Sequence, residues 1–101
     1  MRSVMVRYKV KADRAAENEG YITKVFEQLK SEQPDHLRYA SFKLEDGVSF
    51  VHIAFNDTEN NPNPLTTLSA FKDFTARIGE RCEEPPMTAT LKEIGSYNFF
   101  G

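Results

Sequence analysis

The sequence has few of the residues on which many functions depend. Of its 101 residues, one is a cysteine, Cys82, and none is a tryptophan. A single thiol excludes an internal disulfide and a cysteine-rich metal site. A cysteine nucleophile also needs a base beside it, and His36 and His52 lie in two separate strand-like segments. We therefore expect Cys82 to be an unreactive, half-buried thiol, and we expect neither a metal nor a cofactor.

Long apolar runs and a strong net charge are also missing. No apolar run approaches the ~20 residues that cross a bilayer, and residues 1–10 alternate polar and apolar side chains instead of forming a signal-peptide core. Lys and Arg number 13 against 15 Asp and Glu, which gives a formal charge of -2. Such a charge provides no general attraction to nucleic acid or anionic lipid. We expect a cytoplasmic protein without a membrane or nucleic-acid partner.

The composition is that of one folded globular domain. Hydrophobic residues make up 40% of the chain and charged residues 28%, which is too apolar and too mixed in charge for a disordered protein. A chain of 101 residues closes one hydrophobic core and leaves too few residues for a second. We assign residues 1–97 to a single domain and residues 98–101 to a C-terminal tail.

Four segments have the patterns that are typical of strands, which are an alternation of apolar and polar residues or, in 48–55, a short apolar run. They are residues 3–11, 36–45, 48–55 and 87–97. Between the second and third segments, Asp46 and Gly47 predict a two-residue hairpin turn, whose central positions need positive φ angles. After the first segment, Asp13 is a candidate N-cap for a helix with apolar residues at helical spacing. This helix should end before Pro34, because the residue preceding a proline avoids the α region.

A second helix is predicted between the third and fourth strands. Asn63 and Pro64 have the residue types of an N-cap and a first helical position, and the helix should end at Gly79 or in the Glu-Pro run 83–86. The resulting order, βαββαβ, is the ferredoxin-like arrangement of the α+β class. Right-handed crossovers place both helices on the same face of an antiparallel four-stranded sheet.

The segment 48–55 indicates what covers the other face of this sheet. It is a central strand in the ferredoxin-like order, and both of its alternating faces are apolar apart from Ser49 and His52. In an antiparallel sheet with one face exposed to solvent, apolar and polar residues would alternate regularly along the strand. We therefore expect a second copy of the chain to cover this face, which gives a homodimeric α+β barrel. The apolar tail residues Phe99 and Phe100 are expected to lie on the partner.

Several stretches resemble the dimeric α+β barrel superfamily, particularly its antibiotic-biosynthesis monooxygenase-like and stress-responsive barrel domains. They are "VMVRYKVKADRAAENEGYITKVF", the Asp46-Gly47 hairpin, "FVHIAF" and "AFKDF". The resemblance covers nearly the whole chain as a pattern of elements. It implies a homodimer of sheets packed face to face, and activities that include cofactor-free oxygenation, haem degradation and isomerisation. Asn18 matches only loosely the asparagine that is associated with oxygenase activity.

Three side chains are candidates for catalysis. His52, Tyr8 and Tyr39 are polar residues in strand-like segments that are otherwise apolar. A histidine can take a proton from an acidic phenol or enol near neutral pH, and a tyrosine hydroxyl can hold the resulting oxyanion. This set would suit cofactor-free oxidation of an aromatic or polyketide-like small molecule. The alternative is that His52 is a buried histidine satisfied by hydrogen bonds, and that both tyrosines point their hydroxyls to the rim.

Two other functions stay open. A non-catalytic homodimer that binds a small hydrophobic molecule, or only assembles, agrees with the absence of a strong motif. An RNA-binding module shares the βαββαβ order, and "DGVSFVHIAF" matches part of the RNP1 pattern at Gly47, Phe50 and Val51. Three basic residues on one face of the first strand favour this second alternative: Arg7, Lys9 and Lys11.

Overall fold

The computed structural model describes residues 2–57 and 64–99. Its strands and helices follow in the order β1 (Arg2–Val10), α1 (Ala15–Glu32), β2 (Leu37–Lys43), β3 (Ser49–Asn56), α2 (Ser69–Thr75), α3 (Ile78–Arg81) and β4 (Cys82–Leu91). Two 3-10 turns precede the helices: η1 (Ala12–Arg14) and η2 (Pro64–Thr67).

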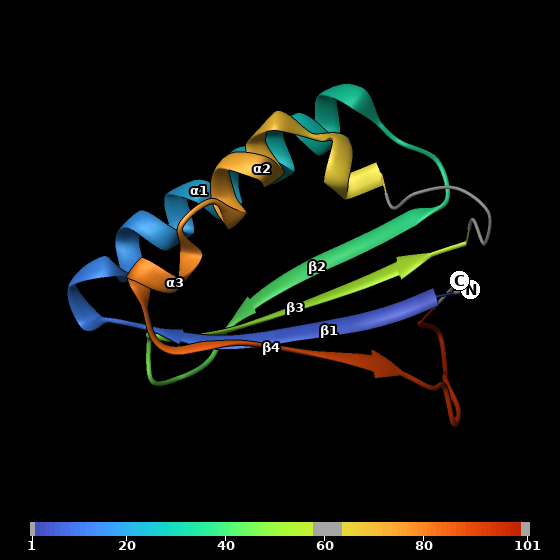
Figure 1. Ribbon diagram of the computed structural model, residues 1–101. Helices are drawn as coiled ribbons and strands as arrows, with labels where there is room; N and C mark the ends of the chain where they lie inside the picture. The colour runs from blue at the N-terminus through green and yellow to red at the C-terminus, as the bar shows by residue number, and fades with distance from the viewer. Residues whose placement is uncertain (1, 58–63, 100–101) are drawn as a thin grey trace.

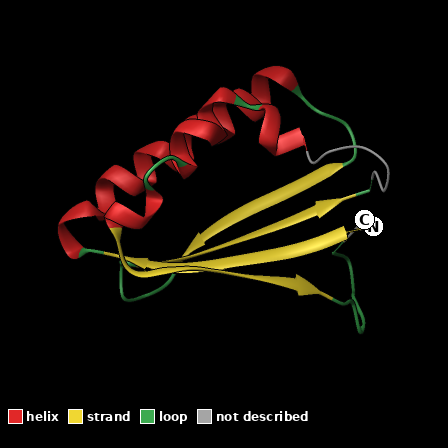
Figure 2. Ribbon diagram, viewed as in Figure 1, coloured by secondary structure: helices red, strands yellow, loops and turns green. Residues whose placement is uncertain are grey.

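The four strands form one antiparallel sheet in the order β2-β3-β1-β4. Figures 1 and 2 show the helices as a single layer over one face of this sheet. This confirms the predicted ferredoxin-like α+β fold, with β1 and β3 as the central strands. No helix among the described residues is long and apolar enough to cross a membrane.

The hydrophobic core lies between the helical layer and the sheet. Alternate residues of the two central strands point to the same side, because Val6 pairs with His52 and Tyr8 pairs with Phe50. These side chains pack against apolar residues of the helices, and the buried core consists of Tyr8, Val10, Val25, Phe50, Leu65, Leu68 and Phe74.

The second predicted helix is broken into three short pieces, which corrects the sequence prediction. Pro64 begins the 3-10 turn η2 instead of an α-helix, and α2 begins only at Ser69. Between α2 and α3, Ala76 is extended and Arg77 has a left-handed conformation with φ 59°. These two residues interrupt the helical hydrogen-bond ladder, so α3 starts in a new direction. The predicted N-cap, Asn63, lies outside the described residues.

Strand β4 begins five residues before the predicted start at Met87, and it ends at Leu91 instead of residue 97. The Glu-Pro run 83–86, expected to be a helix terminator, is part of the strand. Proline is tolerated there because β4 is an edge strand, where a missing N–H need not break a ladder. The pairing with β1 is irregular at this point, with register shifts around Lys9.

Two local predictions about turns are also corrected. Asp13 lies inside η1 and no side chain caps η1 or α1. The β2–β3 connection is longer than two residues, since β2 ends at Lys43 and β3 starts at Ser49. Its conformation is set by Asp46, whose Oδ1 accepts the backbone N–H groups of Val48 and Ser49. Hydrogen bonds, first from the Ser49 hydroxyl and then from the backbone, lower the pKa of Asp46 to about 2. The end of α1 before Pro34 is as predicted.

The helix-free face of the sheet is largely apolar in its middle. Met5 pairs with Ile53 and Ile53 with Ala40, so these side chains share that face. We call it the open face; it comprises Ser3, Met5, Arg7 and Lys9 of β1, Arg38, Ala40 and Phe42 of β2, Ser49, Val51, Ile53 and Phe55 of β3, and Met87, Ala89 and Leu91 of β4. Phe42 and Met87 are 54% and 56% exposed. Phe99 packs edge-on against Phe55 of its own chain, with ring centroids 5.7 Å apart.

Candidate functional site: a histidine between two tyrosines

A cavity of about 890 Å³ lies between the sheet and the helical layer. Strands β1, β3 and β4 form its floor, η2 and α2 form its roof, and Tyr39 of β2 closes one side. Apolar side chains and threonines make up most of the wall. No carboxylate of the described residues lines the cavity. Tyr8, Tyr39 and His52 line it, and its other polar residues besides the threonines are Arg2, Ser3 and Asn56.

His52 contacts the hydroxyl groups of three neighbouring side chains. The side chain is 4% exposed and both of its ring nitrogens have partners. Nε2 lies 2.8 Å from the Tyr8 hydroxyl. Nδ1 lies 3.0 Å from the Tyr39 hydroxyl and 2.6 Å from Oγ of Ser41. The structure therefore brings together all three residues that the sequence singled out, and adds Ser41 to them.

The strand register explains this convergence. His52 of β3 pairs with Ser41 of β2 on one side and with Val6 of β1 on the other. Tyr8 and Tyr39 each lie two residues from these partners, on the same pleated face, and their long side chains reach the ring diagonally. Phe74 of α2 packs over the imidazole at a centroid distance of 5.3 Å. Tyrosines from both neighbouring strands and a phenylalanine from the helical layer thus hold the ring.

Two further buried residues, which were not predicted to belong to a site, extend the network. Asn18 of α1 is fully buried and its Nδ2 donates to the Tyr8 hydroxyl at 2.9 Å. Nε of Arg81 donates to Oδ1 of Asn18 at 3.3 Å, and Nη2 donates to the backbone carbonyl of Phe74 at 2.6 Å. In the sequence, Asn18 stood out only by its loose match to the asparagine that is associated with oxygenase activity. Arg81 gave no signal, because it has the sequence surroundings of an ordinary exposed arginine near a helix end.

Burial dominates the electrostatics of the site. Desolvation lowers the pKa of His52 to about 4, because the imidazolium loses its hydration. Desolvation also raises the pKa of Tyr8 well above its ordinary value, against a smaller lowering by the Asn18 hydrogen bond. The pKa of Tyr39 is raised by burial, and a hydrogen bond from Ser41 opposes that shift. At neutral pH the three side chains are therefore uncharged.

The remaining candidates lie elsewhere. His36 is exposed with φ 64°, and Cys82 is half-buried with a pKa raised by desolvation. Among the described residues, no group of three or more His, Cys, Asp or Glu side chains could hold a metal ion. Arg7 and Lys9 lie on the open face, whereas Phe50 of the RNP1-like stretch is 2% exposed beneath the helices. Phe50 is therefore not available to stack on a base.

The comparisons with known proteins agree on the fold. The sequence matches no protein-family profile and no curated protein. The structure, however, resembles that of an antibiotic biosynthesis monooxygenase, with a TM-score of 0.76, 13% identity, and 94% of this chain and 100% of the other covered.

Two other solved structures match across nearly their whole length. A mutant of SnoaB, a cofactor-independent oxygenase from Streptomyces nogalater, gives a TM-score of 0.69 at 14% identity, with 96% of each chain covered. NE2512, a protein of unknown function from Nitrosomonas europaea, gives 0.72 at 11% identity, with 95% of this chain and 91% of the other covered. This chain thus has the fold of the antibiotic-biosynthesis-monooxygenase and dimeric α+β barrel proteins.

Proposed function

We propose that this protein binds an acidic aromatic or polyketide-like small molecule in the cavity above the sheet and oxidises it with dioxygen, without a cofactor. The observation that carries the proposal is His52, held between the hydroxyls of Tyr8 and Tyr39 in the wall of a mostly apolar cavity. Such a cavity with a few convergent polar groups is the usual form of a small-molecule site. The fold that the chain shares with a cofactor-independent oxygenase supports the proposal.

The chemistry of the wall restricts the substrate. The pKa of His52, about 4, lies about six units below that of an ordinary phenol, so proton transfer from such a phenol to His52 would cost about 8 kcal/mol. His52 is therefore a base only for a substrate that gives up its proton readily. The hydroxyls of Tyr8 and Tyr39 are neutral, and neutral hydroxyls can stabilise an enolate or phenolate oxygen. The reactive form is then the electron-rich anion, which reduces dioxygen.

The proposed reaction is tested with 1,8-dihydroxyanthrone, a tricyclic ketone that ionises at its methylene carbon. Dioxygen oxidises this methylene to a carbonyl; one oxygen atom enters the product anthraquinone and the other leaves as water with both methylene hydrogens. We expect oxygen uptake above the spontaneous rate at pH 8, and a loss of roughly 10²-fold or more in His52→Gln and Tyr39→Phe. Tyr97→Phe is the matched control, because Tyr97 is 89% exposed.

A second outcome favours the non-catalytic alternative. If the anthrone stabilises the protein in a thermal-shift assay but oxygen uptake stays at the spontaneous rate, the cavity binds small molecules without oxidising them. If neither binding nor uptake occurs across a panel of acidic aromatic compounds, the proposal is wrong.

We also propose that two copies of the chain associate through the open face. Most of its central residues are apolar, with Arg7 beside them on β1, and two large side chains at its edge strands, Phe42 and Met87, are more than half exposed. Exposed apolar patches of this kind are typical of interfaces. The proteins of this fold are typically dimeric. The expected placement of Phe99 and Phe100 on the partner stays a prediction: Phe99 contacts its own Phe55, and Phe100 lies outside the described residues.

A further inference from the structure

The hydrogen bonds that join Arg81 to Asn18 and Asn18 to Tyr8 have a fixed direction. An arginine side chain has only donors, so the atom of Asn18 that faces Nε of Arg81 must be its carbonyl oxygen. The NH₂ group of Asn18 is thereby turned toward Tyr8 and donates to the phenolic oxygen. Since that oxygen already accepts a hydrogen bond from Asn18, its own hydrogen is free to point to Nε2 of His52.

The same donor-to-acceptor order extends through the imidazole ring of His52 to the cavity. His52 is neutral at pH 7 because burial lowers its pKa to about 4. If Nε2 accepts from Tyr8, the single ring proton is on Nδ1. Nδ1 then donates to Oγ of Ser41 at 2.6 Å and to the Tyr39 hydroxyl oxygen at 3.0 Å, and the hydroxyl of Ser41 also donates to Tyr39. The hydroxyl hydrogen of Tyr39 has no acceptor left in this chain of donors and is available to the cavity.

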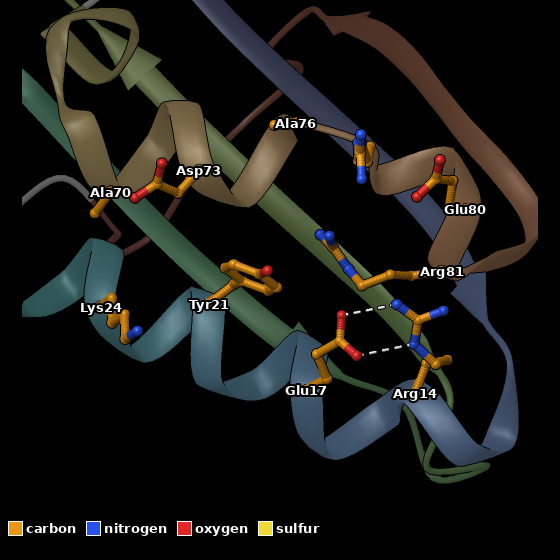
Figure 3. A pocket seen from close by; sticks show the side chains of 10 residues that line it. Arg14, Glu17, Tyr21, Lys24, Ala70, Asp73, Ala76, Glu80 and Arg81 are labelled. Carbon is orange, nitrogen blue, oxygen red and sulfur yellow. Dashed lines mark hydrogen bonds and ion pairs between the residues drawn. The ribbon is translucent and has the colours of Figure 1, made fainter.

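The first donor in this series of hydrogen bonds is a buried positive charge. Arg81 is 2% exposed, and no carboxylate of the described residues forms an ion pair with its guanidinium. Figure 3 shows Arg81 passing over the ring of Tyr21, with its guanidinium carbon 4.5 Å from the ring centroid. The neighbouring carboxylate, Glu17, is bound by two hydrogen bonds to Arg14 instead. A buried cation without a carboxylate partner polarises the hydrogen bonds that it donates.

We propose that Arg81 and Asn18 are positioning residues that fix which atom donates and which accepts in each of these hydrogen bonds. As a result His52 carries its proton on Nδ1, and Tyr39 presents a free O–H to an anionic oxygen in the cavity. Neither residue lines the cavity, so each acts through Tyr8. The assignment of the His52 tautomer is independent of any reaction. The part played by Tyr39 toward a substrate rests on the proposed function.

The arrangement also opposes protonation of His52. In the imidazolium both ring nitrogens carry hydrogens, so the Tyr8 oxygen would face donors from both Asn18 and His52. The hydroxyl hydrogen of Tyr8 would then lose the acceptor that Nε2 provides, because its other partner, Nδ2 of Asn18, is a donor. Arg81 and Asn18 therefore keep His52 neutral and oriented, so that it takes a proton only from a substrate that gives one up readily.

The tautomer is read directly by NMR of protein labelled with ¹⁵N in histidine. In two-bond ¹⁵N–¹H correlations a protonated ring nitrogen differs clearly in chemical shift from an unprotonated one. We expect Nδ1 of His52 to be protonated and Nε2 to be unprotonated at pH 7, which is the reverse of the preference of a free imidazole side chain in water. A wild-type spectrum with the proton on Nε2 overturns the inference without any variant.

The variant Asn18→Asp should reverse the direction of the hydrogen bonds between residue 18, Tyr8 and His52, because an aspartate has almost the same shape as an asparagine but no N–H donor. A carboxylate accepts from Arg81 and also from the Tyr8 hydroxyl, so the Tyr8 oxygen becomes an acceptor for Nε2–H of His52. We expect the ring proton to move from Nδ1 to Nε2. The matched control, Asn98→Asp, makes the same change at an exposed position and should leave the tautomer unchanged. A folded Asn18→Asp protein that keeps Nδ1 protonated contradicts the proposal.

Removal of the positive charge of Arg81 gives an independent test. In Arg81→Met the Asn18 amide can rotate, so we expect His52 to become a mixture of tautomers. Arg77→Met, in which an exposed arginine of the same helical layer is lost, should keep the single wild-type form. An Arg81→Met protein with the unchanged tautomer shows that Arg81 does not set the direction.

The role of Tyr39 is tested by binding alone. The probes are 4-nitro-1-naphthol, which is an anion at neutral pH, and its methyl ether, which is not. We expect Tyr39→Phe to weaken binding of the naphtholate by roughly 10- to 100-fold and to leave binding of the ether unchanged. Equal losses for both probes contradict the donor role of Tyr39. Because neither probe is oxidised, a failure of the proposed oxygenase reaction would not affect this result.

Discussion

The Tyr8 hydroxyl lies 2.8 Å from Nε2 of His52, although 44 positions separate the two residues in the sequence. The contact joins the two central strands of the sheet in the wall of the cavity. It gives each buried polar atom a partner, which buried polar groups need if they are not to destabilise the fold. It also makes the protonation state of one residue depend on the other, so that stability and binding both report on the same pair.

The stability of the protein should fall as the pH is lowered from 7 to 5. The pKa of His52 is about 4 in the folded protein and about 6.5 in an unfolded chain, so the unfolded state binds more protons in this interval. The free energy of unfolding should therefore decrease by about 2 kcal/mol, as measured by urea denaturation at both pH values.

Two variants separate this effect from other titrations. His52→Gln should be less stable than the wild type at pH 7, but it should lose most of the pH dependence between 7 and 5. His36→Asn, which changes an exposed histidine at a left-handed position, should keep the wild-type slope. An unchanged slope in His52→Gln would mean that His52 is not the group that resists protonation.

Two phenylalanines should differ sharply in their contribution to stability. Phe50 lies in the core under the helical layer and is 2% exposed, whereas Phe42 is on the open face and 54% exposed. We expect Phe50→Ala to lower the free energy of unfolding by about 3–5 kcal/mol. Phe42→Ala should change it by less than about 0.5 kcal/mol at concentrations where the chain is monomeric. Equal effects would contradict the assignment of the two faces.

The open face should control self-association. Ile53 lies in the middle of this face, between Met5 and Ala40. A lysine at this position would place an unpaired charge in the interface, so Ile53→Lys should raise the dissociation constant of the dimer by roughly 100-fold or more. Sedimentation velocity across a concentration series measures this change. Thr23→Lys, on the exposed side of α1, is the control and should sediment as the wild type does.

The C-terminal segment should strengthen the same association. Phe99 covers part of the open face at Phe55 and is itself 62% exposed, so a second subunit placed on this face can bury it further. Removal of residues 98–101 should weaken the dimer by roughly 10-fold. A dimer of unchanged affinity at nanomolar concentration would exclude a role for the tail.

Period-two and helical patterns were sufficient to predict the layers of the fold. The alternation in "VSFVHIAF" assigns His52 to one face of a strand and Ile53 to the other, and the structure confirms both assignments. The pattern could not place β4, because Pro85 and Pro86 read as a terminator unless the strand is known to be at an edge. The break at Arg77 was also hidden, since an arginine gives no local signal for a left-handed conformation.

The candidate site was only partly visible in the sequence. Tyr8, Tyr39 and His52 stand out because each is polar in an apolar strand, and the structure brings them together. Arg81 did not stand out, because its burial depends on how α3 packs over Tyr21 and Phe74. A contact between residues 63 positions apart, such as that of Arg81 with Asn18, follows from packing and has no signature in local sequence.

The most direct test of the account is a crystal structure of the protein with 4-nitro-1-naphthol bound. We predict that the rings lie in the cavity between the sheet and the helical layer, with the naphtholate oxygen within hydrogen-bond distance of the Tyr39 hydroxyl. A ligand bound only in a second pocket of the described residues, which Glu17, Tyr21 and Asp73 help to line between α1 and α2, would contradict the account, and so would a cavity filled by side chains that admits no ligand.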